Sequence, residues 1–186
     1  MNERLQGKKL IVEVGPSCFP LYKQKNILND DNIYIGVDKD RSGFHGFGRT
    51  GGEVQGELGH LPIKSSCADE IWLMNVFGEH YAYYQGMHEP ILLSNGKETF
   101  PLITKAYLAD LGRVLKLDGK IYIGEDNTPA PYFEEMDYSE IGFSKKVYSG
   151  EELVNFTNEI GLDSFGHPAI RISKREPYIL VLTKQD

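Results

Sequence analysis

Two apolar segments near the start of the chain each end in residues that could bind a ligand. Residues 10–14 are apolar apart from Glu13 and are followed by Gly15, which predicts a buried strand that leads into a ligand-binding turn. Residues 33–37 form a second apolar segment, which stops at Asp38. In a doubly wound α/β fold, an acid at the tip of the second strand accepts hydrogen bonds from ribose hydroxyls. Together these residues predict a site for a cofactor that contains a nucleoside.

The turn after the first segment does not carry the dinucleotide motif G-x-G-x-x-G. Ser17 and Phe19 stand where later glycines would let the backbone approach a pyrophosphate. The turn therefore argues against a nicotinamide or flavin cofactor.

Strand and helix patterns alternate along the whole chain, which predicts an α/β fold with a mostly parallel sheet. The best-supported helix precedes Lys116, where apolar residues recur at helical spacing until Asp118 and Gly119 form a turn. Ser149 and Glu152 have the spacing of a capping box at the start of another helix. Strands are predicted near residues 9–14, 33–37, 53–57, 69–75, 119–125, 165–173 and 177–184, and helices near residues 20–29, 100–117 and 150–161.

The last two predicted strands are separated by residues 174–177, which are too few for a parallel crossover. They are therefore expected to pair as an antiparallel hairpin. Residues 39–52 are rich in glycine, and each glycine in a helix costs about 1 kcal/mol relative to alanine. A loop is expected there in place of a crossover helix. This loop either partly covers the ligand or is a plain surface connection.

Length and composition limit the class of protein. The 186 residues and 21.0 kDa fit a single domain over residues 1–186. The net charge of −7 disfavours a broad phosphate-binding face, so nucleic acid is not an expected partner. No apolar stretch approaches the roughly 20 residues that span a bilayer, so a cytoplasmic protein without membrane attachment is expected. Cys18 and Cys67 lie in different predicted turns without metal-ligand spacing, so no metal site is expected.

Two longer regions resemble landmark regions of the class I S-adenosylmethionine-dependent methyltransferases. In residues 54–76 an acid precedes an apolar-Pro-apolar turn, and a strand begins after an Asp-Glu step. In residues 108–125 a helix ends in Arg-Val-Leu-Lys, and a glycine-containing turn and a further strand follow. The resemblance covers roughly residues 8–184. It implies a three-layer αβα Rossmann-like fold, with a mostly parallel seven-stranded sheet and an antiparallel C-terminal strand.

The resemblance also implies S-adenosylmethionine as the cofactor and assigns residues to its parts. Gly15 and Ser17 match the small residues under the amino-acid group, and Glu13 matches the acid that helps to hold its ammonium, often through water. Asp38 matches the residue that accepts from both ribose hydroxyls. Glu57 and Leu58 match the pair that binds adenine, and Asn75 matches the residue that faces the methionine part.

The methyl acceptor is expected against the segment after the fourth strand, where members of the family build their acceptor pocket. His80 is the candidate general base for methylation of an oxygen or a nitrogen near neutral pH. Tyr81, Tyr84 and His88 are candidates to line the substrate site. A plain alternative has equal weight, in which this is an amphipathic segment whose tyrosines pack on the sheet. The pocket is expected to be either open or completed by a second subunit in a homodimer.

Three functions remain open from the sequence. The leading one is a methyltransferase that acts on a small molecule or a protein side chain. A binding or scaffold protein that kept the fold and lost methyl transfer is the main alternative, favoured by Ser17, Phe19 and the glycine-rich segment. A nucleotide-dependent oxidoreductase is the weakest. Each candidate also has a structural explanation, for example Gly15 as a turn glycine and Asp38 as a helix cap. Their shared position at the carboxyl ends of strands favours a ligand site.

Overall fold

A computed structural model of the chain describes residues 7–15, 30–38, 54–74, 76, 91–92, 98–99, 105–125, 137–162 and 178–186. The predicted helix at 20–29, the glycine-rich segment 39–52 and the predicted strand at 165–173 lie outside the described residues. No helix in the described ranges has both the length and the apolar character needed to cross a bilayer.

Seven strands form one mixed sheet in the order β3-β2-β1-β4-β7-β9-β8. Neighbouring strands from β3 to β7 in this order run parallel, whereas β9 runs antiparallel to both β7 and β8. This confirms the predicted mostly parallel sheet with an antiparallel C-terminal strand. The strands are β1 (Lys9–Val14), β2 (Asn32–Asp38), β3 (Val54–Gln55), β4 (Ala68–Met74), β7 (Leu115–Glu125), β8 (Phe143–Ser149) and β9 (Tyr178–Lys184). A separate antiparallel pair consists of β5 (Ile91–Leu92) and β6 (Glu98–Thr99).

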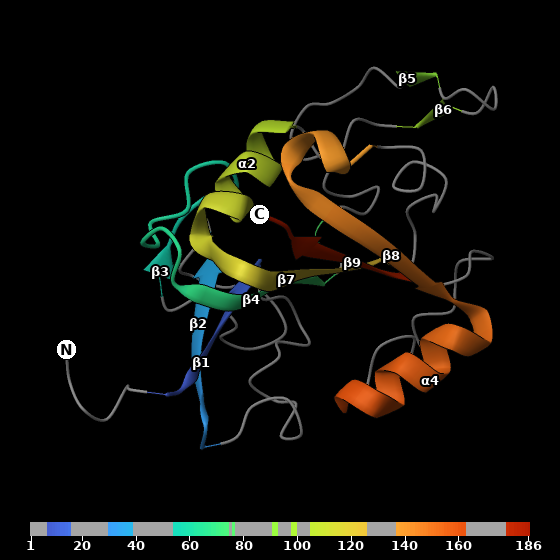
Figure 1. Cartoon of the computed structure of the whole chain (residues 1–186), viewed down its shortest axis with the longest axis horizontal. Coiled ribbons are helices and arrows are strands. Elements are labelled where there is room, and N and C mark those ends of the chain that lie inside the picture. The colour runs from blue at the N-terminus through green and yellow to red at the C-terminus, as the bar shows by residue number, and fades with distance from the viewer. Residues whose placement is uncertain are drawn as a thin grey trace, which may run out of the picture.

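Helices α2 (Lys105–Val114) and α4 (Gly150–Ile160) cover opposite faces of the sheet, as Figure 1 shows. A short 3-10 helix, η3 (Ser139–Ile141), precedes β8. The central strand β4 is buried on both faces, which explains its nearly continuous apolar sequence. On one face Leu108 and Leu111 of α2 are fully buried against Ile71 and Leu73 of β4.

The face under α4 is built from aromatic side chains. The rings of Trp72 and Tyr122 stack with their centroids 4.1 Å apart, and Tyr148 stacks on Phe156 of α4 at 3.9 Å. The buried carboxylate of Glu70 lies beside this stack. It accepts hydrogen bonds from Trp72 Nε1 at 3.0 Å and Tyr122 Oη at 3.1 Å, and Lys9 Nζ lies 2.6 Å from it. Burial, and secondarily the Glu70 charge, raises the pKa of Tyr122, so its hydroxyl stays a donor.

The helix predicted at 100–117 ends earlier than expected. Helix α2 stops at Val114, and Leu115 already pairs with Ala68 of β4. The carbonyls of Arg113 and Val114 accept hydrogen bonds from the backbone N–H groups of Ser66 and Cys67, at 2.8 and 2.9 Å. The segment before β4 therefore takes the carbonyls that a longer helix would use. Asp118, where a turn is predicted, has a φ of +59° but lies inside β7, at the irregularity where the register with β4 shifts between Ala68 and Glu70.

The hairpin predicted between residues 165–173 and 177–184 is wrong, because β9 already has a neighbour on each side. One is β7 and the other is β8, a strand that the sequence patterns did not predict. Helix α4 lies between β8 and β9 in the chain and agrees with the helix predicted at 150–161, with Gly161 as its left-handed C-cap. Ser149 is the N-cap residue, but its side chain makes no capping hydrogen bond, so the predicted capping box does not form.

Candidate functional site

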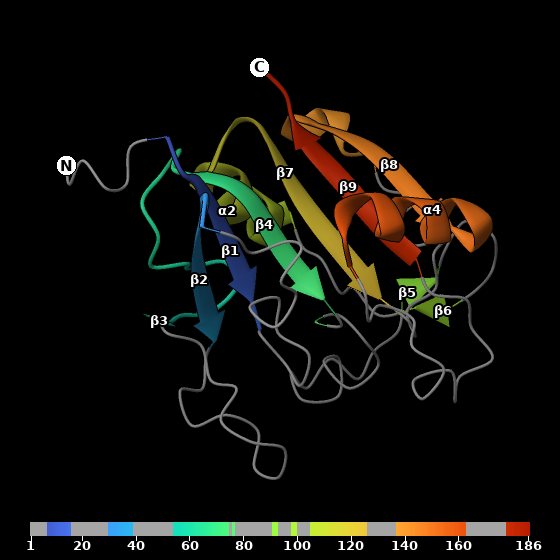
Figure 2. The same ribbon diagram turned by 90° about the horizontal axis from the view of Figure 1, so that it is seen from below.

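The carboxyl ends of β1, β2, β3 and β4 meet at one edge of the sheet, where Figure 2 shows the arrowheads of β1, β2 and β4 side by side. Backbone hydrogen bonds join these ends directly. Gly15 N donates to Val37 O at 2.8 Å, and Gly56 N donates to Asp38 O at 2.9 Å. The predicted residues Gly15, Asp38 and Glu57 are therefore brought together. In an open α/β sheet this edge is where ligands bind.

Gly15 makes the turn after β1 in a conformation that favours glycine. Its φ is +67°, in the left-handed region. A Cβ at this position would lie 3.2 Å from Cγ2 of Val76, which follows β4. The backbone at the end of β1 is therefore packed closely against the end of β4, and a side chain would fill the space between them.

Asp38 is the last residue of β2 and is half-buried. Its backbone is held in register by pairing with Gln55 of β3 and by the hydrogen bond from Gly56. The side chain is thus attached to a fixed strand end, which agrees with the position predicted for the ribose-binding acid.

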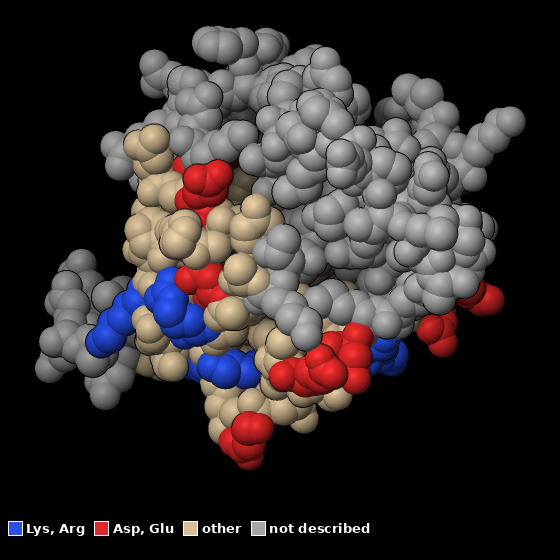
Figure 3. Space-filling model, turned by 90° about the horizontal axis from the view of Figure 1, so that it is seen from above, with Lys and Arg blue, Asp and Glu red and all other residues tan. Residues whose placement is uncertain are grey.

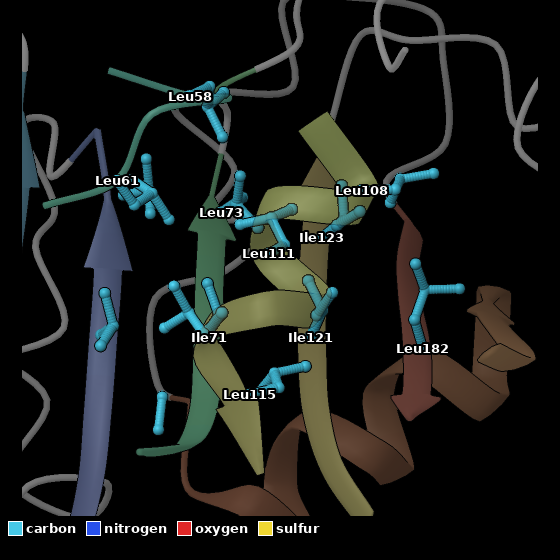
Figure 4. Close-up of a cluster of buried hydrophobic side chains, with 14 of the residues drawn as sticks. Leu58, Leu61, Ile71, Leu73, Leu108, Leu111, Leu115, Ile121, Ile123 and Leu182 are labelled. Carbon is cyan, nitrogen blue, oxygen red and sulfur yellow. The ribbon is translucent and has the colours of Figure 1, made fainter. Parts of the chain in front are cut away.

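Glu57 and Leu58 follow β3 and differ in exposure. The Glu57 side chain is exposed, while Leu58 is buried in the core together with Leu61. Figure 4 shows Leu58 and Leu61 in the same cluster as Leu111 of α2. A tight turn closes this segment, because His60 N donates to Glu57 O at 3.0 Å. Two buried leucines therefore anchor the backbone and leave the Glu57 carboxylate on the surface.

Arg113 of α2 holds the segment that follows Leu58. Its guanidinium donates to Ile63 O at 2.7 Å and to Leu61 O at 2.8 Å, and its Nη2 lies 2.7 Å from Asp110 Oδ1. Asp110 Oδ2 in turn accepts from Leu61 N at 2.7 Å. The planar guanidinium can reach these acceptors together because its donors have a fixed fork geometry. Sequence patterns placed Arg113 in a helix end but gave no sign of these contacts.

Replacing Arg113 with lysine is expected to lower the free energy of unfolding by about 1 to 2 kcal/mol, because an ammonium cannot reach Leu61 O, Ile63 O and Asp110 together. Urea denaturation measures this change. The exposed Lys64 provides the control, since Lys64→Arg alters a basic residue in the same segment. An Arg113→Lys variant with the denaturation midpoint of the parent would show that these contacts contribute little.

Glu13 lies in β1 two residues before Gly15 and is almost completely buried, with 2% of its surface exposed. Its Oε2 accepts a hydrogen bond from Tyr34 Oη of β2 at 2.6 Å. The acid predicted beside the turn is therefore an interior carboxylate with a fixed partner. The sequence patterns did not indicate Tyr34.

Several predicted site residues lie outside the described residues. They are Ser17, Asn75, His80, Tyr81, Tyr84 and His88. Their assignments remain predictions. Across the residues that the structure does describe, no three His, Cys, Asp or Glu side chains are grouped as metal ligands would be. Burial raises the pKa of the Cys67 thiol, so the reactive thiolate is disfavoured there.

Charged side chains of both signs share the surface drawn in Figure 3, where the described lysines and arginines lie next to aspartates and glutamates. Ion pairs form between Arg113 and Asp110 and between Lys116 and Asp69, each with an N to O distance of 2.7 Å. Pairing of this kind reduces the field that these bases present to a polyanion.

Comparison with solved structures identifies the architecture. The chain is similar to the antibiotic-resistance methyltransferase Kmr, with a TM-score of 0.57, 15% sequence identity, and coverage of 98% of this chain and 90% of that chain. It is also similar to the aminoglycoside resistance methyltransferase NpmB1, with a TM-score of 0.54, 14% identity, and coverage of 98% and 90%. The carbon methyltransferase CurJ aligns with a TM-score of 0.51 and 14% identity over 97% of this chain and 50% of that chain. No protein-family model matches the sequence, and comparison with curated proteins finds no relative.

The chain has the Rossmann-like fold of these methyltransferases, as the resemblance to class I enzymes implied. At identities of 13–15% this likeness concerns the fold. The assignment of function rests on the residues at the strand ends.

Proposed function

We propose that this protein is an S-adenosylmethionine-dependent methyltransferase that acts on an oxygen or nitrogen of a small molecule or a protein side chain. The observation that carries the proposal is the convergence of Gly15, Asp38 and Glu57 at the joined ends of β1, β2 and β3. This edge belongs to a sheet with methyltransferase strand order and an antiparallel last strand.

The residues at this edge suit the separate parts of the cofactor. Asp38 offers two oxygens to the ribose diol, and charge-assisted hydrogen bonds of this type are stronger than neutral ones. The exposed Glu57 carboxylate accepts from the exocyclic amine of adenine, and Leu58 N–H donates to a ring nitrogen. Gly15 gives the amino-acid group space, and Glu13 attracts its ammonium. Ser17 and Asn75 complete the proposed cofactor contacts.

Methyl transfer requires mainly alignment of the two reactants. When bound, S-adenosylmethionine would supply an activated methyl group with the sulfur as the leaving group, and the residues at the strand ends would hold it in line with a lone pair of the acceptor. Holding the reactants in this geometry supplies about 7 to 11 kcal/mol in the best-oriented systems. An oxygen or nitrogen acceptor also loses a proton, and we propose that His80 is the general base that accepts it. Tyr81, Tyr84 and His88 are proposed to line the acceptor site.

Acceptors other than nucleic acid are favoured by the net charge of −7 and by the paired surface bases Arg113 and Lys116. A cytoplasmic location, favoured by the two cysteines without disulfide or metal spacing, is part of the same proposal.

Calorimetry on the purified chain tests the cofactor first. S-adenosylmethionine and S-adenosylhomocysteine are expected to bind and NAD is not. Absence of heat with both sulfur ligands would contradict the proposal. Transfer is then tested with cofactor carrying a labelled methyl group and a panel of small-molecule and protein acceptors. Cofactor binding without label transfer to any acceptor would favour a binding or scaffold protein.

A further inference from the structure

The carboxylate of Glu13 and the hydroxyl of Tyr34 form one of the shortest side-chain hydrogen bonds described in the molecule, at 2.6 Å. Glu13 is 2% exposed and lies two residues from the Gly15 turn, at the edge where the strand ends meet. Tyr34 is half-buried in the neighbouring strand β2. A buried acid beside a proposed cofactor site thus has a partner from the next strand.

The register of the two strands makes this contact possible. Ile11 of β1 lies opposite Tyr34, and Glu13 lies opposite Gly36. Tyr34 and Glu13 are therefore diagonal neighbours on one face of the sheet, a separation that a tyrosine ring can bridge. On the β2 side Gly36 has no side chain, so the Tyr34 ring has space to reach Glu13, whereas on the β4 side Glu13 lies opposite the buried Trp72.

A tyrosine hydroxyl is suited to orient a carboxylate that must still bind a cation. It is a neutral donor, so it fixes one carboxylate oxygen without cancelling the negative charge, whereas lysine or arginine in its place would compete with the ligand. A carboxylate has about four acceptor positions, so it can accept from Tyr34 and from other donors at the same time. The attraction between the carboxylate and a cation is also strongest where water is excluded.

We propose that Tyr34 is a positioning residue for the amino-acid group of S-adenosylmethionine and acts through Glu13. The Tyr34 hydroxyl holds the Glu13 carboxylate in the orientation that accepts from the ammonium, directly or through one water. Tyr34 itself does not touch the cofactor. This inference rests on the proposed function, since it concerns the same site.

Two ligands separate this role from a general structural one. S-adenosylhomocysteine carries the amino-acid group, and 5′-methylthioadenosine has the adenosine and sulfur without it. Tyr34→Phe is expected to lower the affinity for S-adenosylhomocysteine roughly tenfold, the factor that corresponds to about 1.4 kcal/mol. The affinity for 5′-methylthioadenosine should stay within about twofold of that of the parent. Glu13→Gln should show the same selectivity, which keeps the inference testable if Tyr34→Phe does not fold. Calorimetry measures each affinity.

A double variant tests whether Tyr34 acts through Glu13. In the Glu13→Gln background, Tyr34→Phe is expected to cause no further loss beyond about twofold, because residues that act as a unit are not additive. Tyr148→Phe is the matched control: it makes the same change on the same sheet face, at β8, where the ring stacks on Phe156 at 3.9 Å. It should leave both affinities unchanged.

The outcomes distinguish the inference from the proposed function. The role of Tyr34 would be overturned if Tyr34→Phe lowers both ligand affinities equally or lowers neither. Additive losses of affinity in the double variant would also overturn it. In each of these cases the cofactor site itself stands. A parent protein that binds neither ligand would overturn the proposed function, and the inference with it.

Discussion

Replacing Asp38 with alanine is expected to reduce the affinity for S-adenosylhomocysteine roughly 100-fold, because about 3 kcal/mol of charge-assisted hydrogen bonding to the ribose diol is lost. The backbone of Asp38 keeps its place, since its pairing with Gln55 and its carbonyl bond from Gly56 do not involve the side chain. The variant should therefore keep the end of β2 in register, and the loss should appear in calorimetry as a weaker affinity.

Two controls isolate the ribose contact. Asp30→Ala removes the same charge at an exposed position before β2 and should leave the affinity unchanged. Asp38→Asn keeps the size of the side chain and one acceptor oxygen, so its loss should be smaller than that of Asp38→Ala. An Asp38→Ala variant that binds the ligand as well as the parent would show that the ribose lies elsewhere.

The importance of Asp38 follows from how the strand ends are joined. The backbone N–H of Gly15 donates to the carbonyl of Val37, which joins the ends of β1 and β2. The backbone N–H of Gly56 donates to the carbonyl of Asp38, which joins the ends of β3 and β2. Proposed contacts to three parts of one ligand thus depend on a continuous set of backbone hydrogen bonds. A rigid frame of this kind lowers the entropic cost of binding because the contact groups are already placed.

The parts of the fold that could be predicted are those with a strong local pattern. The apolar segments of β1, β2 and β4 predict buried parallel strands, and the spacing of Ser149 and Glu152 predicts the start of α4, although the Ser149 side chain does not cap it. Asp38 could be placed at a strand tip for the same reason. Local patterns determine where a strand ends, and the ends of parallel strands share an edge.

Strand β8 shows why the rest could not be predicted. Its sequence, Phe143–Ser149, has Lys145 and Lys146 exposed in the middle, as an edge strand allows. Such a strand lacks a continuous apolar pattern, so the sequence does not predict it. The short separation by residues 174–177 instead favours residues 165–173 as the partner of β9. The partners of β9 depend on the arrangement of the whole sheet, in which β9 pairs with β7 on one side and with β8 on the other.

The contacts of Tyr34 and Arg113 were also beyond a sequence argument. Tyr34 lies 21 positions from Glu13 in the chain, and the Arg113 guanidinium reaches Leu61 O over a separation of 52 positions. Spacing along the chain contains no information on such pairs before the register is known. One signal was present: Gly36 opposite Glu13 leaves space for a neighbouring side chain, but only the register reveals it.

Replacing Gly56 with alanine is expected to lower the free energy of unfolding by about 2 to 4 kcal/mol, because the new methyl group has no space. Its Cβ would overlap with Cδ of Pro62 and would lie 2.9 Å from Cγ1 of Val37. The proline ring is rigid and cannot turn away, so the backbone between β3 and Glu57 must move. Urea denaturation should show the loss of stability, and calorimetry should show weaker binding of 5′-methylthioadenosine because the proposed adenine contacts shift.

A second substitution can show that the Pro62 ring is the cause. Pro62→Ala removes the Cδ and Cγ atoms closest to the new methyl group, so the double variant Gly56→Ala/Pro62→Ala should regain part of the stability lost by Gly56→Ala. Gly142→Ala is the control for the substitution itself: this glycine has a φ of +79°, but a Cβ there would meet no atom within 4 Å. It should cost about 1 kcal/mol from backbone strain and leave ligand affinity unchanged. If Gly56→Ala is no more destabilising than Gly142→Ala, the close packing of Gly56 on Pro62 does not hold the end of β3, and the proposed adenine contacts lose the support that places them.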